Sequence, residues 1–208
     1  MNQPDSLFSQ RRQLASGMIF GIASQTLLGR LPSHALVTNV ATPGLQILED
    51  PESYSSLVYS PPPSTSRSTP PPLIVVLHGA GRNDLDIMKD LADPKGEHAG
   101  LIPSLIQSGQ APLVLLENFA ILAPYAHGRT SFYNDPRSQL LKCIESAKSK
   151  LSFDPNRIFL FGFSDGATVA VELMTTRRFA GAIVCSYGYT GQSLPAPARE
   201  RLVGLPMW

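Results

Sequence analysis

Charge is scarce in this 208-residue sequence, and the two signs nearly cancel. Only 16% of the residues are charged and the formal net charge is +1, whereas an average soluble domain has roughly 25% charged residues. A protein that grips nucleic acid normally carries a basic surface, so this balance argues against a nucleic-acid partner. The hydrophobic share of 43% excludes a disordered chain, because it supplies enough apolar surface for the core of one domain.

Cysteines and long apolar runs are also few. Cys143 and Cys185 are too few for a disulfide scaffold and lack the spacing of a metal site. Both lie in apolar segments, so we expect free, buried thiols, with a disulfide bridge as the alternative. No run reaches the ~18 consecutive apolar residues of a spanning helix, so no stable membrane span is expected.

The first 35 residues differ in composition from the rest of the chain. Arg11 and Arg12 precede a mostly apolar stretch over 14–28, and small residues surround position 34. A basic start, a short apolar body and a small-residue exit are typical of an export signal, and the paired arginines resemble a twin-arginine signal. We therefore predict a targeting segment over 1–35 and a periplasmic or organelle-lumen location. An amphipathic helix of a cytoplasmic protein is the alternative.

The remaining residues, 36–208, predict a single α/β domain. Short apolar runs alternate with helical patterns, which is typical of βαβ crossovers and of a doubly wound, mainly parallel sheet. The proline-rich stretch 61–72 is expected to be a surface loop, with a ligand for a proline-binding domain as the alternative. The expected elements are an edge hairpin at 45–48 and 56–59, strands at 73–77, 119–123, 158–161 and 182–185, and helices over 140–151 and from about 167 to 174.

The strongest motif is Gly162-Phe163-Ser164-Asp165-Gly166, which lies between a predicted strand and a predicted helix. A very tight strand-to-helix turn needs glycine on both sides, because the two elements approach too closely for a Cβ atom. The serine is then presented at the carboxyl end of the strand, beside a helix N-terminus that favours negative charge. We predict that Ser164 is a nucleophile; a tight turn with an incidental serine is the alternative.

A second glycine-rich motif, His78-Gly79-Ala80-Gly81, follows the first buried strand. Glycines here let backbone N–H groups point at a bound oxygen, so the N–H groups of Ala80 and Asp165 are expected to form an oxyanion hole. We expect His78 to brace this loop through hydrogen bonds, with a role as catalytic base as the alternative. Nucleotide binding is disfavoured, because the third glycine of the dinucleotide fingerprint is replaced by Asp84.

Together these motifs resemble the α/β-hydrolase superfamily, and within it the phospholipase/carboxylesterase and dienelactone-hydrolase-like serine esterases. The likeness extends from Leu73 to Trp208 and includes the segment 154–158 ahead of the serine. It implies an esterase that cleaves a small-molecule carboxylic ester or thioester through an acyl-enzyme on Ser164. It also implies that Ala80 and Asp165 are the oxyanion donors and that no metal or other cofactor is needed.

The resemblance is incomplete after the serine. The family places an acid and then a histidine beyond the nucleophile, whereas no histidine follows Ser164 here and the carboxylates that follow are those of Asp165, Glu172 and Glu200. We therefore expect an α/β-hydrolase fold that lacks its last strands, with 204–208 opening the strand that leads to the acid. Impaired catalysis and self-association through an unpaired sheet edge are the expected consequences. A non-catalytic, ligand-binding relative is the alternative.

A group of residues after the strand at 119–123 is expected to line the substrate cleft. Loops that follow parallel strands gather at one edge of the sheet, which places them on the side of the nucleophile. His127 is therefore also a candidate for a substitute base, whereas His98 is expected to be a solvated loop residue. The expected cleft residues are Tyr125, His127, Arg129 and Tyr133.

Overall fold

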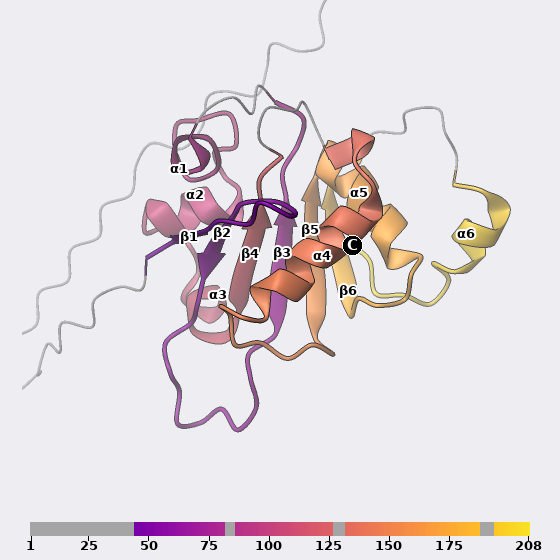
Figure 1. Cartoon of the computed structure of the whole chain (residues 1–208). Helices are drawn as coiled ribbons and strands as arrows, with labels where there is room; N and C mark the ends of the chain where they lie inside the picture. Colours follow the sequence, from indigo (N-terminus) through magenta and orange to yellow (C-terminus); the bar gives the residue numbers. More distant parts are fainter. Residues whose placement is uncertain (1–43, 82–85, 127–131, 188–193) are drawn as a thin grey trace, which may run out of the picture. The chain divides into compact units, whose positions relative to one another are not determined.

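The computed structural model describes residues 44–81, 86–126, 132–187 and 194–208 (Figure 1). Six strands in these ranges form one mixed sheet in the order β1-β2-β4-β3-β5-β6. The pairs β3–β4, β3–β5 and β5–β6 are parallel, and the pairs β1–β2 and β2–β4 are antiparallel. The strands are β1 (Gln46–Leu48), β2 (Ser56–Tyr59), β3 (Leu73–Leu77), β4 (Ala120–Pro124), β5 (Ile158–Phe163) and β6 (Gly181–Cys185).

The helices are mostly short, and all of those described except α6, which follows β6, lie between successive strands. None of the helices in the described ranges is both long and apolar enough to cross a membrane. The predicted targeting segment lies outside these ranges. The helices are α1 (Ile87–Leu91), α2 (Ile102–Gln107), α3 (Leu113–Asn118), α4 (Arg137–Ala147), α5 (Asp165–Met174) and α6 (Ala196–Glu200), with a 3-10 turn η1 (Phe132–Asn134).

The predicted doubly wound, mainly parallel sheet is confirmed, and the predicted hairpin is β1–β2. β4 begins one residue later than expected, because Phe119 still donates its N–H to Leu115 at the end of α3. α5 begins at Asp165, two residues before the predicted start. The stretch 61–72 has no helix or strand, as expected of a loop. Both cysteines are free, but only Cys143 is buried; Cys185 is partly exposed.

The sheet separates two apolar cores, one on each face. Alternate residues of β3 show the division, since successive side chains of a strand point to opposite faces. Leu73, Val75 and Leu77 pack with α4 and α5, whereas Val76 and the partly buried Ile74 pack with α1 and α2. In Figure 1, α4 crosses in front of the central strands. Burial on both faces explains why β3 is an uninterrupted aliphatic run.

The edge of the sheet at β6 is partly paired by residues 206–208, where the opening of a further strand was expected. Met207 forms a parallel bridge with Ala182. The N–H groups of Ala182 and Val184 donate to the carbonyls of Pro206 and Trp208 at 3.0 and 2.8 Å. Residues 206–208 thus follow β6 in the direction expected of a strand opening, and the exposed edge moves outward to them. Self-association through that edge stays a prediction.

Candidate active site

Ser164 lies in the sharp turn between β5 and α5, and its backbone is strained. Its φ of 52° and ψ of −117° cost a non-glycine residue about 1–3 kcal/mol. Backbone hydrogen bonds hold both polar groups of Ser164. Its N–H donates to Cys185 O at 2.9 Å, and its carbonyl accepts from the N–H groups of Ala167 and Thr168. The side chain is partly exposed, at the N-terminal end of the ten-residue helix α5. A serine held in this way can face a ligand and develop negative charge nearby.

The two glycines that flank Ser164 are required by close backbone approach. A Cβ at Gly162 would lie 2.5 Å from the carbonyl oxygen of Gly166, and a Cβ at Gly166 would meet the carbonyls of Leu77 and His78. The backbones at the end of β3, the end of β5 and the start of α5 therefore lie too close together to leave room for a side chain at either glycine. The local sequence therefore folds as the glycine pattern predicts.

The glycine-rich loop after β3 lies against Ser164. A Cβ placed on Gly79 would be 3.2 Å from the Cβ of Ser164, so the next residue, Ala80, is at the same end of the sheet. Ala80 is exposed, and Gly81 and Asp165 are partly exposed. Within the described ranges, no hydrogen bond is recorded from the backbone N–H of Ala80 or Asp165. Two N–H groups in this setting are suitable donors for an oxyanion.

His78 is a buried, neutral residue whose two ring nitrogens are both used. It is 1% exposed; Nδ1 is 2.7 Å from the carbonyl oxygen of Gly79, and Nε2 accepts from the N–H of Ala126 at 3.2 Å. Since Nε2 is the acceptor, Nδ1 carries the proton and donates it to Gly79. Burial lowers the pKa of His78 to about 3. In this arrangement neither nitrogen is available to take a proton from Ser164.

A buried polar cluster lies beside His78, and the sequence did not predict it. The Tyr125 hydroxyl donates to Asp90 Oδ2 at 2.6 Å, and His98 Nε2 lies 3.9 Å from Asp90 Oδ1. Tyr125, Asp90 and His98 are each 3% exposed. The predictions that His98 is solvated and that Tyr125 lines the cleft are therefore wrong, because both rings pack against His78 in the interior. The sequence did carry one signal for this cluster. Asp90 is a charged residue three positions after Ile87, on the apolar side of α1, where a carboxylate needs a buried partner.

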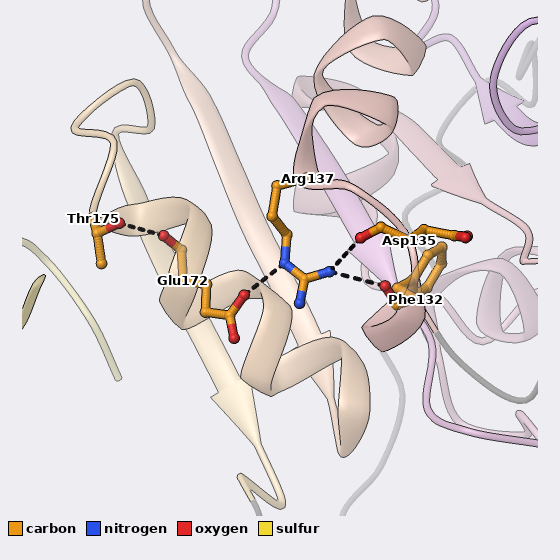
Figure 2. A network of polar contacts seen from close by, with 5 residues as sticks. All are labelled: Phe132, Asp135, Arg137, Glu172 and Thr175. Carbon is orange, nitrogen blue, oxygen red and sulfur yellow. Dashed lines mark hydrogen bonds and ion pairs between the residues drawn. The ribbon is translucent and has the colours of Figure 1, made fainter. Parts of the chain in front are cut away.

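Arg137 connects the 3-10 turn η1 to α5, the helix that carries Ser164 (Figure 2). Its Nε donates to Glu172 Oε2 at 2.6 Å, and its Nη1 donates to the carbonyls of Phe132 and Asp135. The Asp135 carboxylate in turn accepts from the buried Tyr54 hydroxyl at 2.7 Å. Glu172 is thus a structural partner of Arg137 and not an acid at the serine.

Arg137→Ala is expected to lower the free energy of unfolding by about 1–3 kcal/mol, because a partly buried carboxylate and two carbonyls lose a charged donor. The Arg137 side chain is 26% exposed. Lys148→Ala breaks the more exposed pair with Glu145 and should cost less than about 1 kcal/mol. Urea unfolding of both variants measures the difference; equal losses would contradict a special role for Arg137.

The other predicted site residues are not brought to Ser164 by the described part of the chain. His127 and Arg129 lie outside the described ranges. Tyr133 belongs to η1, and its side chain likewise lies outside what is described. Glu200 is exposed in α6. The predicted roles of these residues stay predictions.

Comparison with known proteins bears on the fold. No protein-family model matches the sequence, and no curated protein matches it. A thermostable esterase of known structure is 22% identical, with a TM-score of 0.56, over 80% of this chain and 45% of that chain. An S-formylglutathione hydrolase (FrmB) from Staphylococcus aureus is 14% identical, with a TM-score of 0.45, over 77% of this chain and 65% of that chain.

This chain thus spans less than half the length of the esterase. The described part of this chain has a mixed sheet in the order β1-β2-β4-β3-β5-β6, with a strained serine between β5 and α5. From these features and the similarity to the esterase, we conclude that the described part of the chain has the α/β-hydrolase fold.

Proposed function

We propose that this protein is a serine hydrolase of small-molecule carboxylic esters or thioesters. In this proposal, the Ser164 hydroxyl attacks the carbonyl carbon, the alcohol or thiol leaves, and an acyl-enzyme forms that water then cleaves. The oxygen that becomes negative accepts from the N–H groups of Ala80 and Asp165. The observation that carries the proposal is the strained backbone of Ser164 (φ 52°), directly beside Gly79.

The electrostatics of the turn support the same chemistry. Negative charge on the oxyanion would lie at the N-terminus of α5, where the helix dipole and unpaired N–H groups favour it. The hydrogen bonds of the turn, including the 2.9 Å bond from Ser164 N–H to Cys185 O, hold the strained backbone conformation of Ser164. Because strain of this kind clusters at catalytic sites, it favours a nucleophile over an incidental serine.

We further propose that turnover by these 208 residues is slow, because the described residues bring no base to Ser164, while the role of His127 as a substitute base stays a prediction. No histidine follows Ser164 in the sequence, both ring nitrogens of His78 are in hydrogen bonds, and His98 is buried. Without a base, an oxyanion hole and substrate binding alone still leave about 10³–10⁴-fold acceleration over water. Acylation of Ser164 by an activated ester is therefore expected to be measurable but slow.

Added imidazole is expected to accelerate p-nitrophenyl acetate cleavage by the wild-type chain more than by Ser164→Ala. Imidazole would act as the base that Ser164 lacks, and the variant measures the reaction of imidazole with the ester alone. Intact mass should show one acetyl group on the wild type and none on the variant. Identical rates and masses for the two proteins would overturn the proposal.

A non-catalytic, acyl-binding protein is the second candidate, because the described residues bring no base to Ser164. Such a protein would bind an ester or acyl ligand reversibly, with no covalent product. Binding of a fluorescent acyl ligand that survives unchanged, with equal affinity in wild type and Ser164→Ala, would support this candidate over the first.

A further inference from the structure

We propose that Asp90 is a positioning residue for the oxyanion hole, acting through Tyr125 on the ring of His78. This inference rests on the proposed function, since it assigns a role within the same site. Asp90 lies on α1, on the side of the sheet away from α4 and α5.

The first step is that one buried carboxylate holds the Tyr125 ring and lies next to the His98 ring. Asp90 Oδ2 accepts from the Tyr125 hydroxyl at 2.6 Å, and Asp90 Oδ1 faces His98 Nε2 at 3.9 Å. Their ring centroids lie 5.7 Å and 4.8 Å from that of His78. The carboxylate therefore anchors the Tyr125 ring by a hydrogen bond and lies beside the His98 ring.

The second step is that Tyr125 also sets the backbone that bonds His78. The residue after Tyr125 is Ala126, whose N–H donates to His78 Nε2 at 3.2 Å. Anchoring the Tyr125 hydroxyl restrains the chain at this point. With Nε2 held as an acceptor, the proton of the neutral ring is on Nδ1.

The third step is that Nδ1 controls the peptide plane of the oxyanion donor. Nδ1 donates to the carbonyl oxygen of Gly79 at 2.7 Å, and this carbonyl shares its planar trans peptide with the N–H of Ala80. The C=O and N–H of a trans peptide point in opposite directions. Holding the Gly79 oxygen at His78 therefore fixes the direction in which the Ala80 N–H points.

The chemistry of Asp90 also favours a role beyond packing. A carboxylate with 3% exposure carries a desolvation cost that an aliphatic residue on α1 would not. Among the described residues, no lysine or arginine pairs with it. The hydrogen bond from Tyr125 offsets part of this cost. In return, the Asp90–Tyr125 pair fixes the orientation of the Tyr125 ring.

The test uses the ring nitrogens of the histidines in the full chain, labelled with ¹⁵N. Long-range ¹H–¹⁵N spectra distinguish the two neutral tautomers, and His78 is assigned by elimination with asparagine variants of the other three histidines. The spectra are compared for wild type, Tyr125→Phe and Asp90→Asn. Tyr59→Phe is the matched control, because its phenol is 2% exposed and donates to Leu116 O at 2.9 Å, on another part of the sheet.

We expect wild type and Tyr59→Phe to hold His78 in the Nδ1–H tautomer, and Tyr125→Phe and Asp90→Asn to show a mixture of tautomers. Ser164 labelling by a fluorophosphonate, in the presence of imidazole, should slow about tenfold in these two variants, less than the 10²–10³-fold loss from deleting a donor. Thermal unfolding checks that each variant is folded; Tyr125→Phe keeps the ring and removes only the hydroxyl.

An unchanged His78 tautomer in the folded Tyr125→Phe variant would overturn the inference. Tautomer changes that appear equally in Tyr59→Phe would also overturn it, because they would reflect general loosening. If Ser164 is never labelled in any protein, the proposed function fails, whereas the tautomer measurement still decides whether Asp90 positions His78.

Discussion

Gly166→Ala is expected to remove a large part of the stability of the fold. A Cβ at this position would meet the carbonyl of Leu77 and lie 2.6 Å from the His78 carbonyl oxygen. These are backbone atoms at the end of the central strand β3, so relief requires the strand to move away from α5. Overpacking a core usually costs about 1–3 kcal/mol. Here the contact is with fixed backbone, so we expect more than about 3 kcal/mol, a large part of typical stability.

Urea unfolding of Gly166→Ala and Gly44→Ala measures this effect. Gly44 is the matched control, because a Cβ there would have nothing within 4 Å and its φ is not left-handed. We expect the control to stay within about 0.5 kcal/mol of the wild type. If Gly166→Ala is as stable as the control, the close approach of β3 to the start of α5 is wrong.

Stability is expected to fall as the pH is lowered from 7 to 5, because His78 resists protonation in the folded state. Burial lowers the pKa of His78 to about 3, whereas in the unfolded chain a histidine titrates near 6.5. Below about pH 6.5 the unfolded state therefore binds a proton that the folded state excludes. The stabilisation is complete above this pH and is lost as the pH falls toward 3. His78 alone should contribute about 2 kcal/mol of loss by pH 5.

Other ionisable groups also contribute to the pH dependence of the free energy of unfolding. Burial also lowers the pKa of His98, so it adds to the loss over the same range. Hydrogen bonds lower the pKa values of Asp50 and Asp154 below their ordinary 3.8, so these carboxylates matter only under more acidic conditions. Unfolding measured at pH 7 and pH 5 in wild type and His78→Asn separates the contributions. A pH-independent stability in the wild type would contradict the buried, neutral state of His78.

The turn at Ser164 could be predicted from the sequence because its cause is local. Gly162 and Gly166 are required by contacts within a few residues of the turn and with the end of β3. A motif of glycines between an apolar run and a helical pattern therefore predicts the geometry directly. The apolar run 73–77 was equally informative, since burial on both faces leaves a continuous aliphatic sequence.

The surroundings of His78 could not be predicted, because distant segments create them. His98 follows Gly96 and Glu97, a polar local sequence that is typical of a solvated loop. Its burial comes from Asp90 and His78, which lie on other elements. Arg137 and Glu172 are likewise 35 residues apart. Pairings of this kind depend on how the helices pack on the sheet. A local sequence pattern does not predict that packing.

The most direct test of the account is the position of a fluorophosphonate adduct. Cleavage after arginine releases residues 158–177, a peptide in which Ser164 is the single serine. We predict slow labelling of this peptide, faster with added imidazole, and no label in Ser164→Ala. An adduct on any other peptide, or equal labelling of wild type and Ser164→Ala, would contradict the assignment of Ser164 as the nucleophile.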